Sequence, residues 1–130
     1  MRINIIYIVL ISIGGILFSC TQNPSKQEMA PITQNVTPPE FVQGELLFQN
    51  NCSICHGVRG SGTDKGPSFL SPIYEPNHHG DESFVLAARN GVRSHHWPFG
   101  DMPPLPHVKE DEVRQIVAYV RWLQKEARVY

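Results

Sequence analysis

Two cysteines and a histidine, Cys52, Cys55 and His56, lie close enough along the chain to act together on one group. Two residues separate the thiols, and the imidazole follows the second thiol directly. Thiols at this spacing add across the two vinyl groups of a haem to form thioethers, and the imidazole then reaches the iron from one face. The pattern therefore predicts one covalently bound haem c with His56 as an axial ligand.

Two uses of the same residues without haem remain as alternatives. A thioredoxin-like dithiol would need only Cys52 and Cys55, but the surrounding sequence lacks the βαβ pattern expected of that fold. A zinc site would combine the thiols with two histidines, and it leaves the direct adjacency of Cys55 and His56 unexplained. Soret absorption by the purified protein separates haem from both alternatives.

Met102 is the candidate for the second axial ligand of the iron. It is the one methionine of the predicted domain, and its loop carries Pro98, Pro103, Pro104 and Pro106, each of which fixes φ. A thioether on a stiff loop suits low-spin iron, because little has to move when one electron arrives or leaves, and His/Met ligation raises the reduction potential. The alternative role for this side chain is that of a flexible core filler.

Two pairs of adjacent histidines, His78-His79 and His95-His96, stand in the middle of the chain, and Trp97 follows the second pair. Three interpretations compete. His95 or His96 would replace the methionine on the iron, or the pairs would hold a second metal, with copper the natural candidate for clustered imidazoles. The third, favoured because adjacent side chains on an extended loop point apart, is a set of surface histidines in which one imidazole or the Trp97 indole donates to a haem propionate.

The third cysteine, Cys20, predicts export and lipid attachment. It follows a single early cation, Arg2, and an apolar stretch of 14 residues from Ile5 to Phe18. That stretch is shorter than the roughly 18 residues that a membrane-spanning helix needs, so it fits the apolar region of a signal peptide. A small residue before the cysteine, Ser19, resembles the cleavage site of bacterial lipoproteins. An uncleaved anchor or a signal peptide cut elsewhere are the alternatives.

Length and charge then define the rest of the chain. We predict a signal peptide over 1–19, a polar, proline-punctuated tether over 20–36 and one small domain over 37–130. The whole chain has 11 Lys and Arg against 12 Asp and Glu, and removal of the signal takes away one cation, leaving a net charge of −2. This weak charge gives no support for nucleic-acid binding.

The elements that must position these side chains are expected to be helices. Thr37 and Glu40 fit a capping box at the start of a first helix, which would end near Asn51, directly before the thiols. Gly44 costs this helix about 1 kcal/mol relative to alanine, which suggests close approach by another helix.

Two further helices are expected after the thiols. One would run from Asp81, as N-cap, to a stop at Gly91. The other would begin at the acids from Glu110 and end near Lys125, and its apolar positions recur at helical spacing: Val113, Ile116, Val117, Val120 and Leu123. The Gly- and Pro-rich sequence between the haem motif and these helices gives strands little support.

These residues resemble the class I c-type cytochromes over roughly Phe41 to Leu123. The matching features occur in the family's order: Gly44, Phe48, the run Cys52 to Gly57, Gly66-Pro67, Asn90-Gly91-Val92, Met102-Pro103 and Ile116 to Val120. The resemblance implies a small all-α cytochrome c fold, with three to four helices and loops wrapped around one haem.

The resemblance also assigns individual roles. Gly44 and Phe48 would cross the last helix at Ile116 and Tyr119. The Pro67 carbonyl would accept a hydrogen bond from the His56 ring, and Leu70 would pack on the haem.

The function expected from these features is that of a single-haem electron carrier, not an enzyme, although it could be a subunit of an oxidoreductase complex. Its partners would be a redox donor and an acceptor protein, and it would act as a monomer or as a subunit of a respiratory complex. A lipid anchor at Cys20 would hold it on a membrane, facing the periplasm or the cell exterior. The alternatives are a haem enzyme or gas-binding sensor with a labile sixth ligand, and a cytochrome subunit tied to a copper- or metal-handling oxidase.

Overall fold

The computed structural model describes residues 36–130, so Cys20, the predicted signal segment and nearly all of the predicted tether lie outside the described residues. Within residues 36–130 the secondary structure is helical, and no strand is formed. This confirms the all-α prediction. The α-helices are α1 (Val42–Asn51), α2 (Ser53–His56), α3 (Asp81–Asn90) and α4 (Glu110–Glu126), and short 3-10 turns occupy Pro39–Phe41, Val58–Gly60 and Pro72–Tyr74. None of these helices is long and apolar enough to cross a bilayer.

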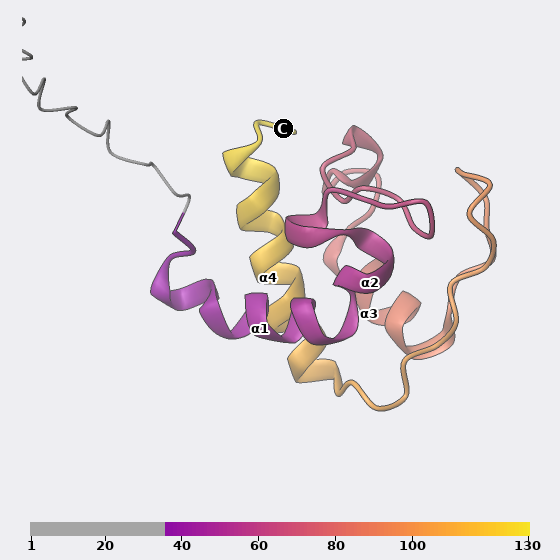
Figure 1. The fold of residues 1–130 in the computed structure, drawn as a ribbon, viewed down its shortest axis with the longest axis horizontal. Coiled ribbons are helices and arrows are strands. Elements are labelled where there is room, and N and C mark those ends of the chain that lie inside the picture. Colours follow the sequence, from indigo (N-terminus) through magenta and orange to yellow (C-terminus); the bar gives the residue numbers. More distant parts are fainter. Residues whose placement is uncertain (1–35) are drawn as a thin grey trace, which may run out of the picture. The chain divides into compact units, whose positions relative to one another are not determined.

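Helix α1 crosses α4, as Figure 1 shows, and Gly44 lies at the crossing. A Cβ atom at Gly44 would lie 2.2 Å from the backbone oxygen of Gln115 and 2.9 Å from the Cβ of Tyr119, so only glycine permits this approach. Phe48 and Tyr119, both almost fully buried, pack at the crossing with ring centroids 5.7 Å apart. The crossing expected from the sequence is therefore confirmed, and its core also includes Ile116.

The start of the first helix differs from the prediction. Thr37 makes no capping bond; a 3-10 turn at Pro39–Phe41 comes first, and α1 begins only at Val42. The reason is the pair Pro38-Pro39, because a residue that precedes proline is driven out of the helical region of φ and ψ. The capping box at Thr37 and Glu40 was therefore a wrong prediction, whereas the end of the helix at Asn51 is as expected.

Helix α3 packs against the N-terminal half of α4 through a second small core of Val85, Ala88, Val113 and Val117. It begins one residue earlier than predicted, because Gly80 is the N-cap and Asp81 lies in the first turn. There the carboxylate favours the helix by its interaction with the dipole. Gly91 ends α3, as the sequence indicated.

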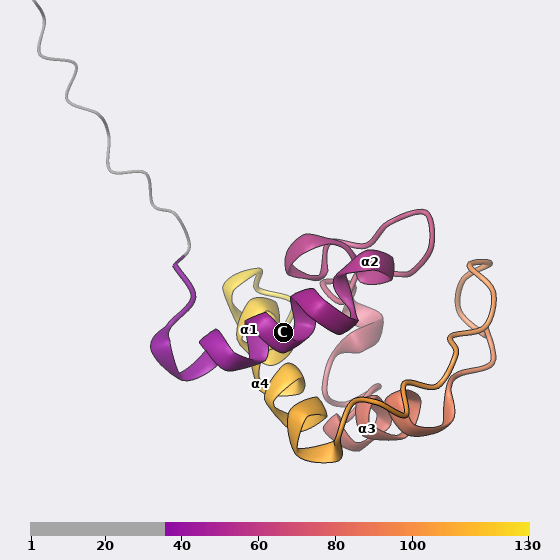
Figure 2. The same ribbon diagram turned by 60° about the horizontal axis from the view of Figure 1, so that its bottom comes forward.

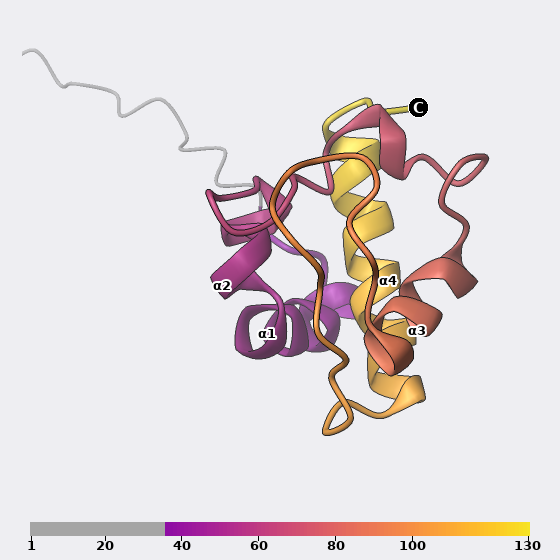
Figure 3. The ribbon, with the colours of Figure 1, turned by 90° about the vertical axis from the view of Figure 1, so that its right-hand side faces the viewer.

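Residues 91–109 connect α3 to α4 without regular structure apart from one antiparallel bridge between Val92 and Met102. Figures 2 and 3 show this connection as a long loop that rises away from the ends of α3 and α4. The bridge and the Leu105 N–H, which donates to the carbonyl of Ala88 at 2.7 Å, fix its base against α3. The connection thereby forms the side of the molecule that faces the haem motif across a cavity.

Candidate functional site

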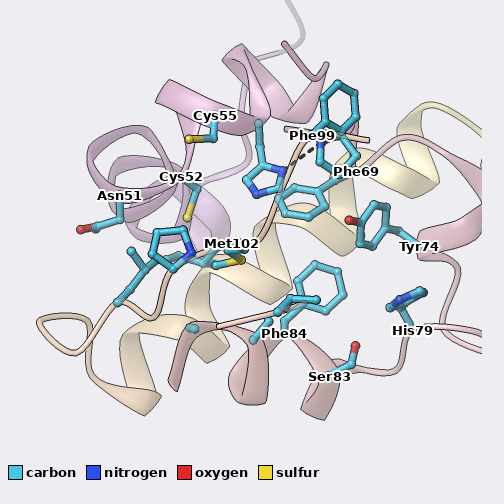
Figure 4. A pocket seen from close by; sticks show the side chains of 18 of the residues that line it. Asn51, Cys52, Cys55, Phe69, Tyr74, His79, Ser83, Phe84, Phe99 and Met102 are labelled. Carbon is cyan, nitrogen blue, oxygen red and sulfur yellow. Dashed lines mark hydrogen bonds between the residues drawn. The ribbon is translucent and has the colours of Figure 1, made fainter. Parts of the chain in front are cut away.

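A cavity of about 350 Å³ lies among α2, α3, α4 and the connection over residues 91–109. Most of its lining is apolar, and the polar exceptions include Cys52, Cys55 and His56. Figure 4 shows Cys52, Cys55 and Met102 extending into this region from different segments of the chain. The structure thus brings the predicted thiols, imidazole and thioether to one cavity, although about 46 residues of sequence separate the first ligand candidate from the second.

His56 presents a neutral imidazole to the cavity. Its ring Nδ1 lies 2.9 Å from the carbonyl oxygen of Pro67, and because a carbonyl only accepts, Nδ1 carries the proton and Nε2 keeps its lone pair. The ring is buried and stacks on Phe69 with centroids 4.1 Å apart. This burial lowers the pKa of His56, although the bond to Pro67 opposes the shift. A buried, oriented and unprotonated imidazole is the form that binds iron.

The two thiols occupy the junction between α1 and α2. Cys52 is the C-cap of α1 and the N-cap of α2, and its N–H donates to the carbonyl of Phe48 at 2.8 Å, so the chain turns at this residue and brings Cys55 and His56 round. Burial, and after it the charge of Cys55, raise the pKa of Cys52 to about 12. Cys52 is therefore a protonated thiol at neutral pH. Together with Cys55 it would hold a haem through thioether bonds to the two vinyl groups.

Met102 lines the same cavity from the loop side. Its backbone N–H and carbonyl both pair with Val92 at 2.9 Å, which fixes the position of its Cα relative to the end of α3. Gly91, at φ +75°, allows this pairing, because a Cβ atom there would lie 2.6 Å from the Met102 oxygen. The sequence indicated a loop stiffened by prolines, and the structure adds a two-bond bridge that the sequence does not reveal.

The segment after Pro67 differs from the sequence prediction by one residue. Phe69 lines the cavity and stacks on His56, whereas Leu70 is absent from the cavity lining and packs instead on the core cluster around Phe48. The Phe69 N–H bonds to the carbonyl of Gly60 at 2.9 Å, and this bond sets the direction of the side chain. Phe69 rather than Leu70 therefore lines the cavity, and the contact of Leu70 with the haem stays a prediction.

Aromatic residues of the cavity were missed by the sequence reasoning because they follow no period. Tyr74 and Phe84 both line it, with ring centroids 5.9 Å apart. The Trp97 indole was predicted, as the alternative to an imidazole, to donate to a haem propionate; Trp97 lines the cavity and stacks on Tyr74, with ring centroids 5.6 Å apart and an interplanar angle of 15°. The concentration of aromatic rings in a Gly- and Pro-rich segment is the signal that could have indicated them, because such rings require a buried partner.

Contrary to the prediction, the two side chains of each histidine pair do not point apart. His78 and His79 lie in a tight turn, in which both N–H groups bond to the carbonyl of Glu75 at 3.0 and 2.8 Å, so the alternation of an extended loop does not apply. His96 joins them from the connection between α3 and α4. The pKa of His96 is lowered by desolvation first, and then by the neighbouring histidines.

The residues at the cavity fit a haem c. Two thiols in adjacent turns, a neutral imidazole with a free Nε2 and a thioether supply the attachment points and the ligand types that haem iron accepts, and the apolar lining suits a porphyrin. Among residues 36–130 neither thiol is engaged in a disulfide.

Comparison with known protein families identifies a family for this chain. The family model described as "Cytochrome c" matches residues 41–124, which is more than half of the chain. No curated protein and no solved structure matches the sequence.

Proposed function

The chain belongs to the cytochrome c family, with a covalently bound haem c and a function in electron transfer, and from this membership we propose that it is a single-haem carrier whose iron is held between His56 and Met102. The observation that carries the proposal is that the free Nε2 side of the His56 ring and the Met102 side chain belong to the lining of the same cavity. The sulfur and the imidazole come from separately fixed segments, which suits a ligand pair that stays in place through both oxidation states.

In this proposal the haem supplies an iron that exchanges one electron, and the residues around it hold the two iron ligands in place. Pro67 orients His56 through its carbonyl, and the bridge with Val92 holds Met102. The apolar lining excludes water, which limits solvent reorganisation when the charge at the centre changes.

We propose that the protein exchanges electrons with other proteins, and that no bond in a substrate is made or broken. Ile54 lines the cavity and is 75% exposed, and Phe99 lines it and is 38% exposed. Apolar side chains on the surface beside the site provide a contact for a redox donor and an acceptor protein.

We further propose that Cys20 carries a lipid that holds the domain at a membrane facing the periplasm or the cell exterior. Labelled fatty acid incorporated by the full chain, and lost in C20S, tests this point.

Ligation by Met102 is tested with the long-wavelength charge-transfer band from sulfur to ferric iron. We expect this band in the oxidised haem-loaded protein and its loss in M102A, together with a lower reduction potential. M29A is the matched control, because Met29 belongs to the predicted tether, and it should retain the band.

The same spectra distinguish the remaining alternatives. A band that is absent from the unmodified protein, or that survives in M102A, would contradict ligation by Met102. Loss of a low-spin spectrum in H95Q or H96Q would instead identify a bis-histidine iron. Rapid binding of carbon monoxide by the reduced, undenatured protein would favour a gas-binding or catalytic site with a labile sixth ligand.

A further inference from the structure

Three histidine side chains from two distant segments converge at one edge of the cavity. His78 and His79 follow the 3-10 turn at Pro72–Tyr74, and His96 belongs to the connection between α3 and α4. The Nε2 atoms of His78 and His96 are 3.4 Å apart, and one ring nitrogen from each of the three residues lies within 4.8 Å of the others.

The separation of two of the ring nitrogens is close to that of ligands around one metal ion. Imidazole nitrogens bind first-row metals at about 2.0–2.1 Å, and two such ligands in a tetrahedral site are then about 3.3 Å apart. The 3.4 Å separation of His78 and His96 already meets this value. Both residues are exposed, so small rotations of their side chains suffice to bring all three nitrogens to bonding distance.

His79 is oriented as a metal ligand should be. Its Nδ1 donates to the carbonyl of Ile73 at 2.6 Å, which leaves the lone pair on Nε2. A backbone carbonyl that accepts from the second ring nitrogen is the usual outer-shell partner of a metal-bound histidine, because it fixes the tautomer and the ring orientation.

The turn that carries His78 and His79 is fastened to α4 by a buried polar network. Arg121 is only 8% exposed and donates to the carbonyls of Tyr74 and His79. Gln124, fully buried, donates to the Tyr74 carbonyl at 3.1 Å and accepts from Arg121 at 2.8 Å. The backbone beneath the histidines is therefore fixed before any ion arrives.

The segment that carries His96 is fixed to Tyr74, in the turn just before His78 and His79. Trp97 stacks on Tyr74, and the Ser94 N–H donates to the carboxylate of Asp101 at 2.9 Å, which closes the loop. His95 lies next to the cluster, with its ring centroid 4.3 Å from that of His96. It is available as a further ligand.

We propose that His78, His79 and His96 form a binding site for a divalent first-row transition metal ion, copper(II) above the others, in addition to the haem iron. Three neutral imidazoles suit copper, nickel and zinc, and the general order of affinities places copper(II) first among them. Magnesium and calcium prefer oxygen ligands and are excluded by this donor set. Coordination positions beyond the three imidazoles are left to water or to His95.

The test uses haem-loaded protein without a polyhistidine tag, titrated with copper(II), zinc(II), nickel(II) and magnesium(II) in separate calorimetric experiments. We expect one tight copper(II) ion per chain, weaker zinc and nickel, and no magnesium. The electron paramagnetic resonance spectrum of the bound copper should show splitting from three nitrogen ligands. H78Q and H96Q should each weaken copper binding by more than the ten- to hundredfold that loss of an outer-shell partner typically costs.

His107 provides the matched control. It is exposed, it lies outside the cluster, and its Nε2 bonds to the Asn51 side chain at 3.2 Å, so H107Q should bind copper like the unmodified protein. Absence of a stoichiometric copper ion, unchanged affinity in H78Q and H96Q, or an equal loss in H107Q would each overturn the proposal.

The result does not depend on the ligation of iron by Met102, because copper resonance and the iron charge-transfer band are separate signals. A change of the iron spectrum in H96Q would assign this histidine to the haem and would also overturn the metal site. Unfolding midpoints of the histidine variants, measured in parallel, exclude loss of copper through loss of the fold.

Discussion

The cavity has two sides that are built in different ways. The helical side, formed by α2, α3 and α4, carries the thiols and His56, and it adjoins the crossing of α1 and α4 at Gly44. The loop side, residues 91–109, carries Met102 and His96 and has one isolated bridge as its regular pairing. Each side nevertheless depends on a glycine that faces a backbone oxygen, which is that of Gln115 for Gly44 and that of Met102 for Gly91.

The difference between the two sides indicates what each contributes. The helix crossing is part of the main core, with Phe48, Tyr119 and Val120 almost completely buried, so a fault there affects the whole fold. The bridge between Val92 and Met102 lies outside both core clusters, so a fault there displaces the ligand while the fold survives. Substitutions at the two glycines test this division.

The largest effect is expected from Gly44→Ala. The new Cβ would be 2.2 Å from the Gln115 oxygen, and backbone on both helices must move to relieve the clash. We expect a loss of about 3 kcal/mol in the free energy of unfolding, at the upper end of the usual range for overpacking. Urea denaturation followed by far-ultraviolet circular dichroism measures it.

Gly80→Ala is the control for this measurement. Gly80 has an ordinary backbone conformation, and the nearest atom to a new Cβ would be the Pro76 oxygen at 3.6 Å. The loss of a glycine N-cap should cost less than about 1 kcal/mol. Equal costs at the two positions would show that the helix crossing is not the critical contact.

A smaller effect on stability and a specific effect on the iron ligand are expected from Gly91→Ala. Its φ of +75° costs an alanine about 1–2 kcal/mol, and the new Cβ would lie 2.6 Å from the Met102 oxygen. The bridge must then open and shift Met102. We expect the oxidised protein to lose much of its long-wavelength charge-transfer band while its helical circular dichroism is retained.

Gly100→Ala separates the strain of a positive φ from the contact with the Met102 oxygen. Gly100 lies in the same loop at φ +85°, and no atom lies within 4 Å of a new Cβ there. It carries the same backbone strain without the contact to Met102. The band should therefore persist in this variant. If both alanines weaken the band equally, strain in the loop rather than the bridge positions Met102.

The division between the two sides also explains what the sequence could predict. Helix α4 was predictable because its apolar positions repeat every three to four residues, from Val113 to Leu123. The close approach at Gly44 followed from a glycine retained within a helix. The start of α1 was not predicted correctly, because the restriction imposed by Pro38-Pro39 outweighed the capping pattern at Thr37.

The candidate site was predictable where its residues are neighbours in the sequence. Cys52, Cys55 and His56 form one motif, and the chain itself brings them together. The position of Phe69 rather than Leu70 at the cavity, and the convergence of His79 with His96, depend on turns that no periodicity records. Hydrogen bonds from Phe69 to Gly60, and from His78 and His79 to Glu75, determine those directions.

The smallest effect is expected at the contact between α3 and α4 that faces solvent, away from the cavity. Glu110 pairs there with Arg89, and with Arg114 at 2.8 Å, and Arg114 also reaches Glu82 at 2.6 Å. All four side chains are about half exposed or more, so their pairing is screened by water and salt. This network contrasts with the partly buried bonds that Arg121 donates to the carbonyls of Tyr74 and His79, which join α4 to the histidine turn.

Glu110→Gln should therefore lower the urea midpoint only slightly, and in a pH-dependent way. The hydrogen bond from Arg114, followed by the charges of Arg114 and Arg89, lowers the pKa of Glu110 in the folded protein against the opposing effect of desolvation. A carboxylate whose pKa is lowered by folding stabilises the fold above its unfolded pKa, and this contribution is lost as the pH falls through the folded pKa. The urea midpoints of the variant and the unmodified protein should thus differ at neutral pH, become equal in acid, and also become equal in 1 M salt, where the screening length is about 3 Å.

Asp111→Asn is the control. It removes another first-turn acid but none of the ion pairs found among residues 36–130. If it reproduces the pH dependence of Glu110→Gln, the helix dipole rather than the arginine network is responsible.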